Sequence, residues 1–171
     1  MCGIVGAVAE RPITGILIEG LKRLEYRGYD SAGVAILKSN GDTTCIKREG
    51  KVEALAAAIK QQAPIGTTGI AHTRWATHGV PSERNAHPHQ SGNRFSVVHN
   101  GIIENHQELR ATLTADGYVF ASDTDTEVIV HLIHKLSAEH LSLRSTVFAV
   151  SQKLVGAYGM VVVDSQSPDE L

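Results

Sequence analysis

Apolar and polar positions along the chain follow two periods, one typical of strands and one typical of helices. Short apolar or β-prone runs predict strands at residues 4–9, 32–37, 43–48, 68–73, 95–99 and 158–164. Apolar residues at helical spacing predict helices at residues 14–27, 52–62, 105–116 and 142–154, and a further helix after residue 127. Because short connections join the early strands and the helices come in pairs, the pattern favours α+β layers over a regular alternation of strands and helices.

Local signals add detail to this pattern. Asn40-Gly41 predicts a tight hairpin turn between two of the strands. Asn105, three residues before Glu108, is typical of a helix N-cap. For Asp123, a helix-cap role is favoured over a contact with substrate. The helix after residue 127 is expected to turn one apolar face inward, formed by Val128, Ile129, Leu132, Ile133 and Leu136.

Residues 74–93 interrupt the regular pattern. The segment is polar, rich in His, Pro and Gly, and too long for a simple turn. Loops of this kind carry binding and catalytic residues more often than the elements that they connect. We therefore expect a functional loop between the strands at 68–73 and 95–99.

Length and composition restrict the class of protein. The chain has 171 residues, of which 42% are hydrophobic and 20% charged, which suits one folded domain and excludes a wholly disordered chain. A net charge of −2 supplies no basic surface for nucleic acid and no polybasic membrane anchor, and no apolar run has the length of a transmembrane helix. We expect a cytoplasmic protein with no nucleic acid and no membrane as partners, and leave a homo-oligomer open.

The two cysteines differ in their chemistry. They allow at most one disulfide, which is no framework for a secreted fold. Cys45 lies in a β-prone stretch, where a partly buried structural thiol is expected. Cys2 follows Met1, and removal of Met1 would give Cys2 a free α-amine, whose ordinary pKa is about 8. Nucleophile and base would then belong to one residue.

Five motifs occur in an order that matches a known family. They are MCGIVG at residues 1–6, YRGYDSAG at 26–33, HTRWATHG at 72–79, HNGIIEN at 99–105 and SDTDTE at 122–127. Together they resemble the glutaminase domain of the glutamine-fructose-6-phosphate aminotransferase family. That domain belongs to the class II glutamine amidotransferases, which are N-terminal nucleophile hydrolases. The block at 26–33 resembles this branch more than the amidophosphoribosyltransferase branch.

The resemblance implies a fold and a reaction. The fold would be a four-layer αββα sandwich, with residues 1–171 forming one glutaminase domain. Cys2 would attack the side-chain amide of L-glutamine, release ammonia and form a γ-glutamyl thioester. Asn100 and the backbone N–H of Gly101 would form the oxyanion hole, where positioned donors stabilise the charge of the transition state.

The resemblance also implies how glutamine is held. Arg74 would bind the α-carboxylate, a task suited to a planar fork of donors. Asp125 would accept the α-ammonium group. The pocket would be lined and closed by Trp75, Thr77 and His78. Arg27 would support the nucleophile.

The nine histidines raise the question of a metal. Five of them come close together in sequence, at His72, His78, His87, His89 and His99. Their spacing matches no standard zinc pattern, and the chain has no Gly-rich phosphate loop. Since the implied thioester chemistry needs neither, we expect no metal and no cofactor.

In the resembled family the chain continues past the equivalent of Leu171. We therefore expect a C-terminally truncated glutaminase domain without the sugar isomerase domain, which in the full-length enzyme uses the ammonia to make glucosamine 6-phosphate from fructose 6-phosphate. One alternative is a catalytically inactive fragment that acts only in association with the missing part or a partner. Another keeps the glutaminase reaction but has a different ammonia acceptor, which the block at 26–33 disfavours.

Overall fold

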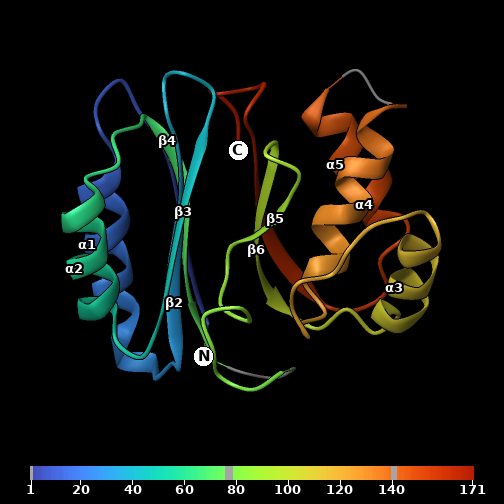
Figure 1. Ribbon diagram of the computed structural model, residues 1–171, viewed down its shortest axis with the longest axis horizontal. Helices are drawn as coiled ribbons and strands as arrows, with labels where there is room; N and C mark the ends of the chain where they lie inside the picture. The colour runs from blue at the N-terminus through green and yellow to red at the C-terminus, as the bar shows by residue number, and fades with distance from the viewer. Residues whose placement is uncertain (1, 76–78, 140–141) are drawn as a thin grey trace.

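The computed structural model describes residues 2–75, 79–139 and 142–171, with only the backbone at Arg27. Four layers lie side by side: two helices, two facing β-sheets, and a second group of helices (Figure 1). The α+β class predicted from the pattern is confirmed, and so is the αββα order of layers that the resemblance implies.

The first sheet is antiparallel and has the strand order β1-β4-β2-β3. Its strands are β1 (Gly3–Val8), β2 (Ser31–Leu37), β3 (Thr43–Glu49) and β4 (Thr68–Arg74). β2 and β3 form the hairpin that Asn40-Gly41 predicts, with Gly41 at a φ of 87°. β2 and β4 are buried along their whole lengths because they are the central strands and are covered on both faces.

The second sheet has the order β5-β6-β7. Its strands are β5 (His89–Ser91), β6 (Phe95–Gly101) and β7 (Tyr158–Asp164). The bounds of β7 are those predicted from its apolar run. β6 is two residues longer than predicted, so that Asn100 and Gly101 belong to the strand and pair with Gly159 and Tyr158.

Helices cover the outer face of each sheet (Figure 1). The first sheet is covered by α1 (Thr14–Leu24) and α2 (Val52–Gln62), and α1 continues into a 3-10 turn, η1 (Glu25–Arg27). On the second sheet, α4 (Glu127–Ser137) packs against β5 and β6, and α3 (His106–Ala115) and α5 (Leu143–Ser151) pack against α4. The inward face predicted for the helix after residue 127 is confirmed, since all five of its apolar residues are buried in α4.

The hydrophobic core is divided by the two sheets. One cluster fills the space between α1, α2 and the first sheet, with Leu17, Val34 and Leu55 fully buried. A larger one lies between the second sheet and its helices. A smaller cluster, including Ile70 and Val98, lies where the two sheets face each other. Apolar burial on both sides of each sheet drives the four layers together.

Asn105 does not cap α3 through its side chain, contrary to the expectation from Glu108. It occupies the N-cap position, but no cap hydrogen bond forms there. Its Nδ2 donates to the Lys153 carbonyl over 2.9 Å and its Oδ1 accepts from Val155 N over 3.0 Å. The Asn105 side chain therefore hydrogen-bonds the loop after α5 instead of the N-terminus of α3.

Across the described ranges, no helix combines the length and the apolar character that a bilayer crossing requires.

Candidate active site

The thiol of Cys2 lies where β1 begins, beside the end of β4. The backbone N–H of Trp75 donates to Cys2 Sγ over 3.1 Å, and the Trp75 carbonyl oxygen lies 3.6 Å from the same sulfur. The next residue, Gly3, pairs with Thr73 and donates its N–H to Thr73 Oγ1 over 3.1 Å. Pairing of β1 with β4 therefore positions this thiol at the end of β4.

The end of β6 brings the predicted oxyanion donors to Cys2. Asn100 Nδ2 donates to the Cys2 carbonyl oxygen over 3.3 Å. A side-chain amide nitrogen carries two hydrogens, and this contact uses one of them. Because β1 and β6 belong to different sheets, the contact forms where the two sheets meet.

Gly101 has surroundings that exclude a side chain. Its φ is 125°, and a Cβ atom built on it would lie 2.2 Å from the Ala157 carbonyl oxygen and 2.7 Å from Tyr158 Cα. Both neighbours are backbone atoms of the adjoining chain, which cannot swing aside. Glycine is therefore required for β7 to lie against the end of β6.

Substituting Gly101 by alanine is expected to lower the free energy of unfolding by at least about 2 kcal/mol, because it adds a backbone clash to a positive φ. Urea unfolding followed by circular dichroism measures the change. Gly159→Ala is the matched control, because Gly159 is the partner of Asn100 in β7 and has no atom within 4 Å of its Cβ position. Equal unfolding free energies for the two variants would contradict the steric argument.

Arg74 is the last residue of β4 and is only 4% exposed. Its guanidinium lies 3.7 Å from Asp30 Oδ1 and donates to the Gly79 carbonyl oxygen over 3.1 Å. Asp30 also donates its backbone N–H to the Arg74 carbonyl oxygen over 2.7 Å. A buried guanidinium held at these two points presents a fixed planar fork, which suits a carboxylate ligand.

Asp125 is fixed near the end of β6. It lies before α4, is 4% exposed, and its Oδ2 accepts the N–H of Ile103 over 2.8 Å. Ile103 follows Gly101 by two residues, so this bond brings the carboxylate to the segment that follows the predicted oxyanion donors. A buried carboxylate there suits a cationic group of a bound molecule.

Trp75 is half exposed, at 54%, and lies beside η1. A Cβ built on Gly28 would lie 2.7 Å from Trp75 Cζ3, so the absence of a side chain at Gly28 lets the indole pack there. Arg27 is the last residue of η1 and directly precedes Gly28, which brings its backbone to this region. Thr77 and His78 were also predicted to line the pocket, and they lie outside the described residues.

Asp123 does not cap a helix, because α4 begins at Glu127, four residues later. Its carboxylate pairs with Arg84 and lies 3.4 Å from Asn85 Nδ2. Asn85 Oδ1 also accepts the backbone N–H of Asp123 over 2.9 Å. These contacts join the predicted functional loop to the segment that carries Asp125.

Four histidines are buried together behind these residues: His72, His87, His89 and His99. The rings of His72 and His87 are stacked with centroids 4.2 Å apart. Burial lowers the pKa of His72 to about 4 and lowers the pKa of His87 and His89 well below the usual value, so these rings are neutral at pH 7. Among the residues that the structure describes, no three metal-binding side chains are grouped as a metal site would require.

Cys45 contrasts with Cys2. It lies on β3, partly buried and not in a disulfide, as the sequence predicts. Burial raises the pKa of its thiol, which keeps it protonated and weakly nucleophilic.

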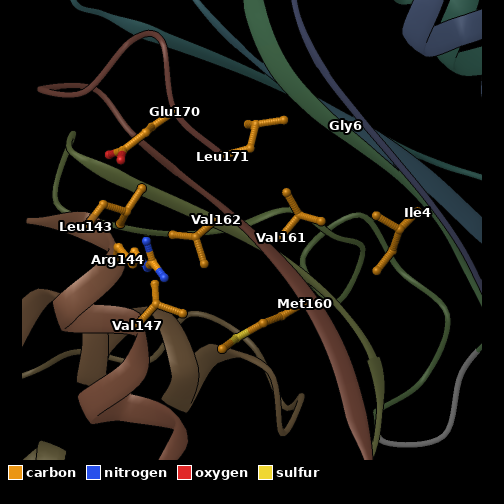
Figure 2. Close-up of a pocket in the computed structure, with 10 residues that line it drawn as sticks. All are labelled: Ile4, Gly6, Leu143, Arg144, Val147, Met160, Val161, Val162, Glu170 and Leu171. Atoms are coloured by element: carbon orange, nitrogen blue, oxygen red, sulfur yellow. The ribbon is translucent and has the colours of Figure 1, made fainter.

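A pocket of about 680 Å³ lies apart from the candidate residues, between β1, β7 and α5 (Figure 2). Aliphatic side chains and Met160 make up most of its lining, and Arg144 and Glu170 contribute charge. It contains none of the predicted site residues. The candidate site is therefore placed at the strand ends around Cys2, where the predicted residues lie.

The structure thus brings together Cys2, Arg74, Trp75, Asn100, Gly101 and Asp125. Sequence reasoning assigned no role to Asp30 or His72, although both contact site residues directly. Each lies inside one of the quoted motifs, at 26–33 and 72–79, and that position was the available signal.

A thiol at the second residue, where two facing sheets meet in an αββα sandwich, is typical of a class of amidohydrolase, and comparison with known proteins places the chain within it. The sequence profile of the glutamine amidotransferase domain matches residues 72–170. The chain therefore belongs to the glutamine amidotransferase domain family.

One group of relatives narrows the family assignment further. The whole chain is 59% identical to glutamine-fructose-6-phosphate aminotransferase (isomerizing) of Idiomarina loihiensis, and 60% and 61% identical to those of Pseudomonas putida and Yersinia pestis. It spans 28% of the length of each of these relatives. It is homologous to their glutaminase part.

Solved structures agree on the fold. Glutamine phosphoribosylpyrophosphate amidotransferase from B. subtilis superposes with a TM-score of 0.80 at 25% identity, over 96% of this chain and 35% of that one. A structure described as the allosteric regulatory enzyme of purine biosynthesis superposes with a TM-score of 0.81 at 26% identity, over 96% of this chain and 36% of that one. These neighbours share the N-terminal nucleophile fold of the glutamine amidotransferases.

Proposed function

We propose that this chain hydrolyses L-glutamine to glutamate and ammonia, with Cys2 as the nucleophile once Met1 has been removed. The observation that carries the proposal is the position of the thiol. Cys2 Sγ accepts the Trp75 N–H over 3.1 Å, while the Cys2 carbonyl oxygen accepts Asn100 Nδ2 over 3.3 Å. A nucleophile and an amide donor thus lie together in a chain of the glutamine amidotransferase family.

Each step of the reaction has a residue to perform it. The α-amine of Cys2 accepts the thiol proton as sulfur attacks the side-chain carbonyl carbon of glutamine. The same proton then passes to the leaving nitrogen, the C–N bond breaks, and ammonia departs from a γ-glutamyl thioester. Water attacks the thioester, with the amine again as base, to give glutamate and the free thiol.

Asn100 and Gly101 stabilise the tetrahedral intermediates. The second N–H of Asn100 Nδ2 and the backbone N–H of Gly101 donate to the oxyanion, and each such donor is worth about 3 kcal/mol in a transition state. Both residues end β6, which is paired along its length with β7. The donors are therefore held in place before the substrate arrives.

Arg74 and Asp125 bind the two charged ends of the amino acid. The guanidinium takes the α-carboxylate and the carboxylate takes the α-ammonium, an arrangement that rejects glutamine within a peptide. Trp75, Thr77 and His78 line and close the pocket, and Arg27 supports the nucleophile. Support comes from the contacts that hold both groups in place, of Arg74 with Asp30 and Gly79 and of Asp125 with the N–H of Ile103.

We infer that, in a full-length protein like these relatives, the ammonia is used to aminate a sugar phosphate. The relatives of 59–61% identity are named for transfer from glutamine to fructose 6-phosphate, and this chain corresponds to 28% of their length. We infer that a sugar isomerase domain receives the ammonia and forms glucosamine 6-phosphate for hexosamine synthesis. The reaction takes place in the cytoplasm, where thiols such as those of Cys2 and Cys45 stay reduced.

Intact mass spectrometry tests the proposal. The protein, freed of Met1, is exposed to an electrophilic analogue of glutamine and then digested. We expect one adduct, mapped to Cys2, that free glutamine suppresses and asparagine does not.

Cys45 is the internal control in that experiment, because burial raises the pKa of its thiol and it should stay unlabelled. Labelling of Cys45 as fast as Cys2 would indicate nonspecific alkylation. Absence of an adduct on a folded, Met1-free protein would overturn the proposal and favour a catalytically inactive fragment.

A further inference from the structure

His72 lies directly behind Asn100, on the side away from solvent. It is on β4, fully buried, and its Nε2 is 2.8 Å from Asn100 Oδ1. The two side chains come from different sheets, since Asn100 is near the end of β6. This hydrogen bond crosses the sandwich beside the nucleophile.

The direction of the hydrogen bond follows from the neighbours of the amide. The Cys2 carbonyl oxygen is an acceptor only, so Asn100 must direct its Nδ2 toward it. Asn100 Oδ1 then faces His72, which must donate from Nε2. The imidazole is therefore the Nε2–H tautomer, and its Nδ1 carries a lone pair.

The ring is neutral and fixed in orientation. Burial lowers the pKa of His72 to about 4, although its hydrogen bond to Asn100 acts in the opposite direction. His72 also stacks on His87, with ring planes 21° apart. His87 is itself held, because its Nδ1 accepts the backbone N–H of His99 over 3.3 Å.

An amide beside an oxyanion needs such support. Rotating the Asn100 amide by 180° would exchange its oxygen and nitrogen, which have similar shape. The oxygen would then face the Cys2 carbonyl and the developing negative charge, and the stabilisation would become repulsion. A fixed donor on the other side of the amide prevents that rotation.

We propose that His72 is a positioning residue for the glutaminase reaction: its Nε2–H holds Asn100 in the orientation that presents Nδ2 to the oxyanion. The inference rests on the proposed function. His72 itself does not touch the substrate and acts through Asn100.

Two substitutions at His72 separate positioning from packing. His72→Leu fills much of the same space and removes the donor, whereas the side-chain amide of His72→Gln places an N–H near the position of Nε2. We expect the leucine variant to lower kcat for glutamine by about 10-fold or more while KM changes less than about 2-fold. The glutamine variant should recover most of the lost kcat. Equal kcat for the wild type and the leucine variant would overturn the inference.

A double-mutant cycle tests whether His72 acts through Asn100. Asn100→Ala alone should reduce kcat by about 100-fold or more. Adding His72→Leu to it should cause little further loss, because the amide to be positioned is gone. Losses that multiply would show an independent role and overturn the inference. His131→Gln, another buried histidine that bonds Ser91 instead, should leave kcat unchanged.

Nitrogen NMR of histidine-labelled protein provides a readout that does not depend on activity. At pH 7 the ring of His72 should be neutral, protonated on Nε2 and bare on Nδ1. A proton on Nδ1, or on both nitrogens, would overturn the inference even in an active enzyme. If the wild type released no ammonia, the proposed function would fail, and the tautomer would still decide whether His72 holds Asn100.

Discussion

Replacing Cys2 with alanine is expected to reduce ammonia release from glutamine by at least about 10⁴-fold, to the background rate. Without the sulfur no thioester forms, and the remaining groups can only stabilise attack by water. Backbone pairing holds β1 to β4, and Asn100 contacts the Cys2 carbonyl oxygen rather than the sulfur. The variant should therefore fold and still bind glutamine.

A coupled glutamate dehydrogenase assay measures ammonia, and isothermal calorimetry measures glutamine binding to the inactive variant. Cys45→Ala is the matched control, because Cys45 lies on β3 outside the site and its loss should change the rate less than about 2-fold. Ammonia release by the Cys2 variant at more than a hundredth of the wild-type rate would exclude Cys2 as the nucleophile. A protein that retains Met1 should behave like the Cys2 variant, because its α-amine belongs to another residue.

Acidification from pH 7.5 to 5.0 is expected to remove several kcal/mol from the free energy of unfolding. Burial lowers the pKa of His72 to about 4, below its usual 6.5, and lowers the pKa of His87 and His89 well below the usual value. Such groups bind protons more readily when unfolded, so their contribution is complete above pH 6.5 and is lost as the pH falls toward the folded pKa. At pH 5 the loss from His72 alone is about 2 kcal/mol, and His87 and His89 add to it in the same direction.

Urea unfolding at the two pH values tests this expectation. If all three rings take up protons only in the unfolded chain, the free energy of unfolding near pH 5 should fall by about 4 kcal/mol for each unit by which the pH is lowered. His72→Gln removes one of these rings, so its loss between pH 7.5 and 5.0 should be smaller by about 2 kcal/mol than that of the wild type. Equal stability of the wild type at both pH values would mean that the buried rings do not stay neutral.

The fold follows from local patterns where burial repeats regularly. β7 and α2 have the bounds that the sequence predicts, because an apolar run and a helical spacing reflect the face that each element buries. β5 could not be predicted in this way. It has three residues, two of them buried polar side chains, and it becomes a strand through its pairing with β6.

Side-chain hydrogen bonds were predicted less well than elements. Asn105 and Asp123 both have cap-like spacing, yet each bonds a segment distant in sequence. Spacing reports what a residue can do for its own helix. The spacing contains no information on which distant loop the fold brings close to the side chain. In both cases the side chain hydrogen-bonds that loop instead of its own helix.

The residues of the candidate site were likewise easier to predict than the contacts between them. Cys2, Arg74 and Asn100 were predicted because they stand at fixed places in motifs that resemble a family. The pairing of His72 with Asn100 depends on the approach of two sheets, and no pattern within either strand indicates it. Motifs thus identify the groups that do chemistry more readily than the groups that orient them.

The contacts around Cys2 also bear on when the protein becomes reactive during synthesis. β1 is made first, but its neighbour β4 follows about sixty residues later and the end of β6 about thirty residues after that. Contacts so far apart in sequence form late, because loop closure must precede them. The newly made Cys2 would therefore lack its contacts with Trp75 and Asn100 until both sheets had docked. Hydrolysis of glutamine would then begin only once the sandwich had folded.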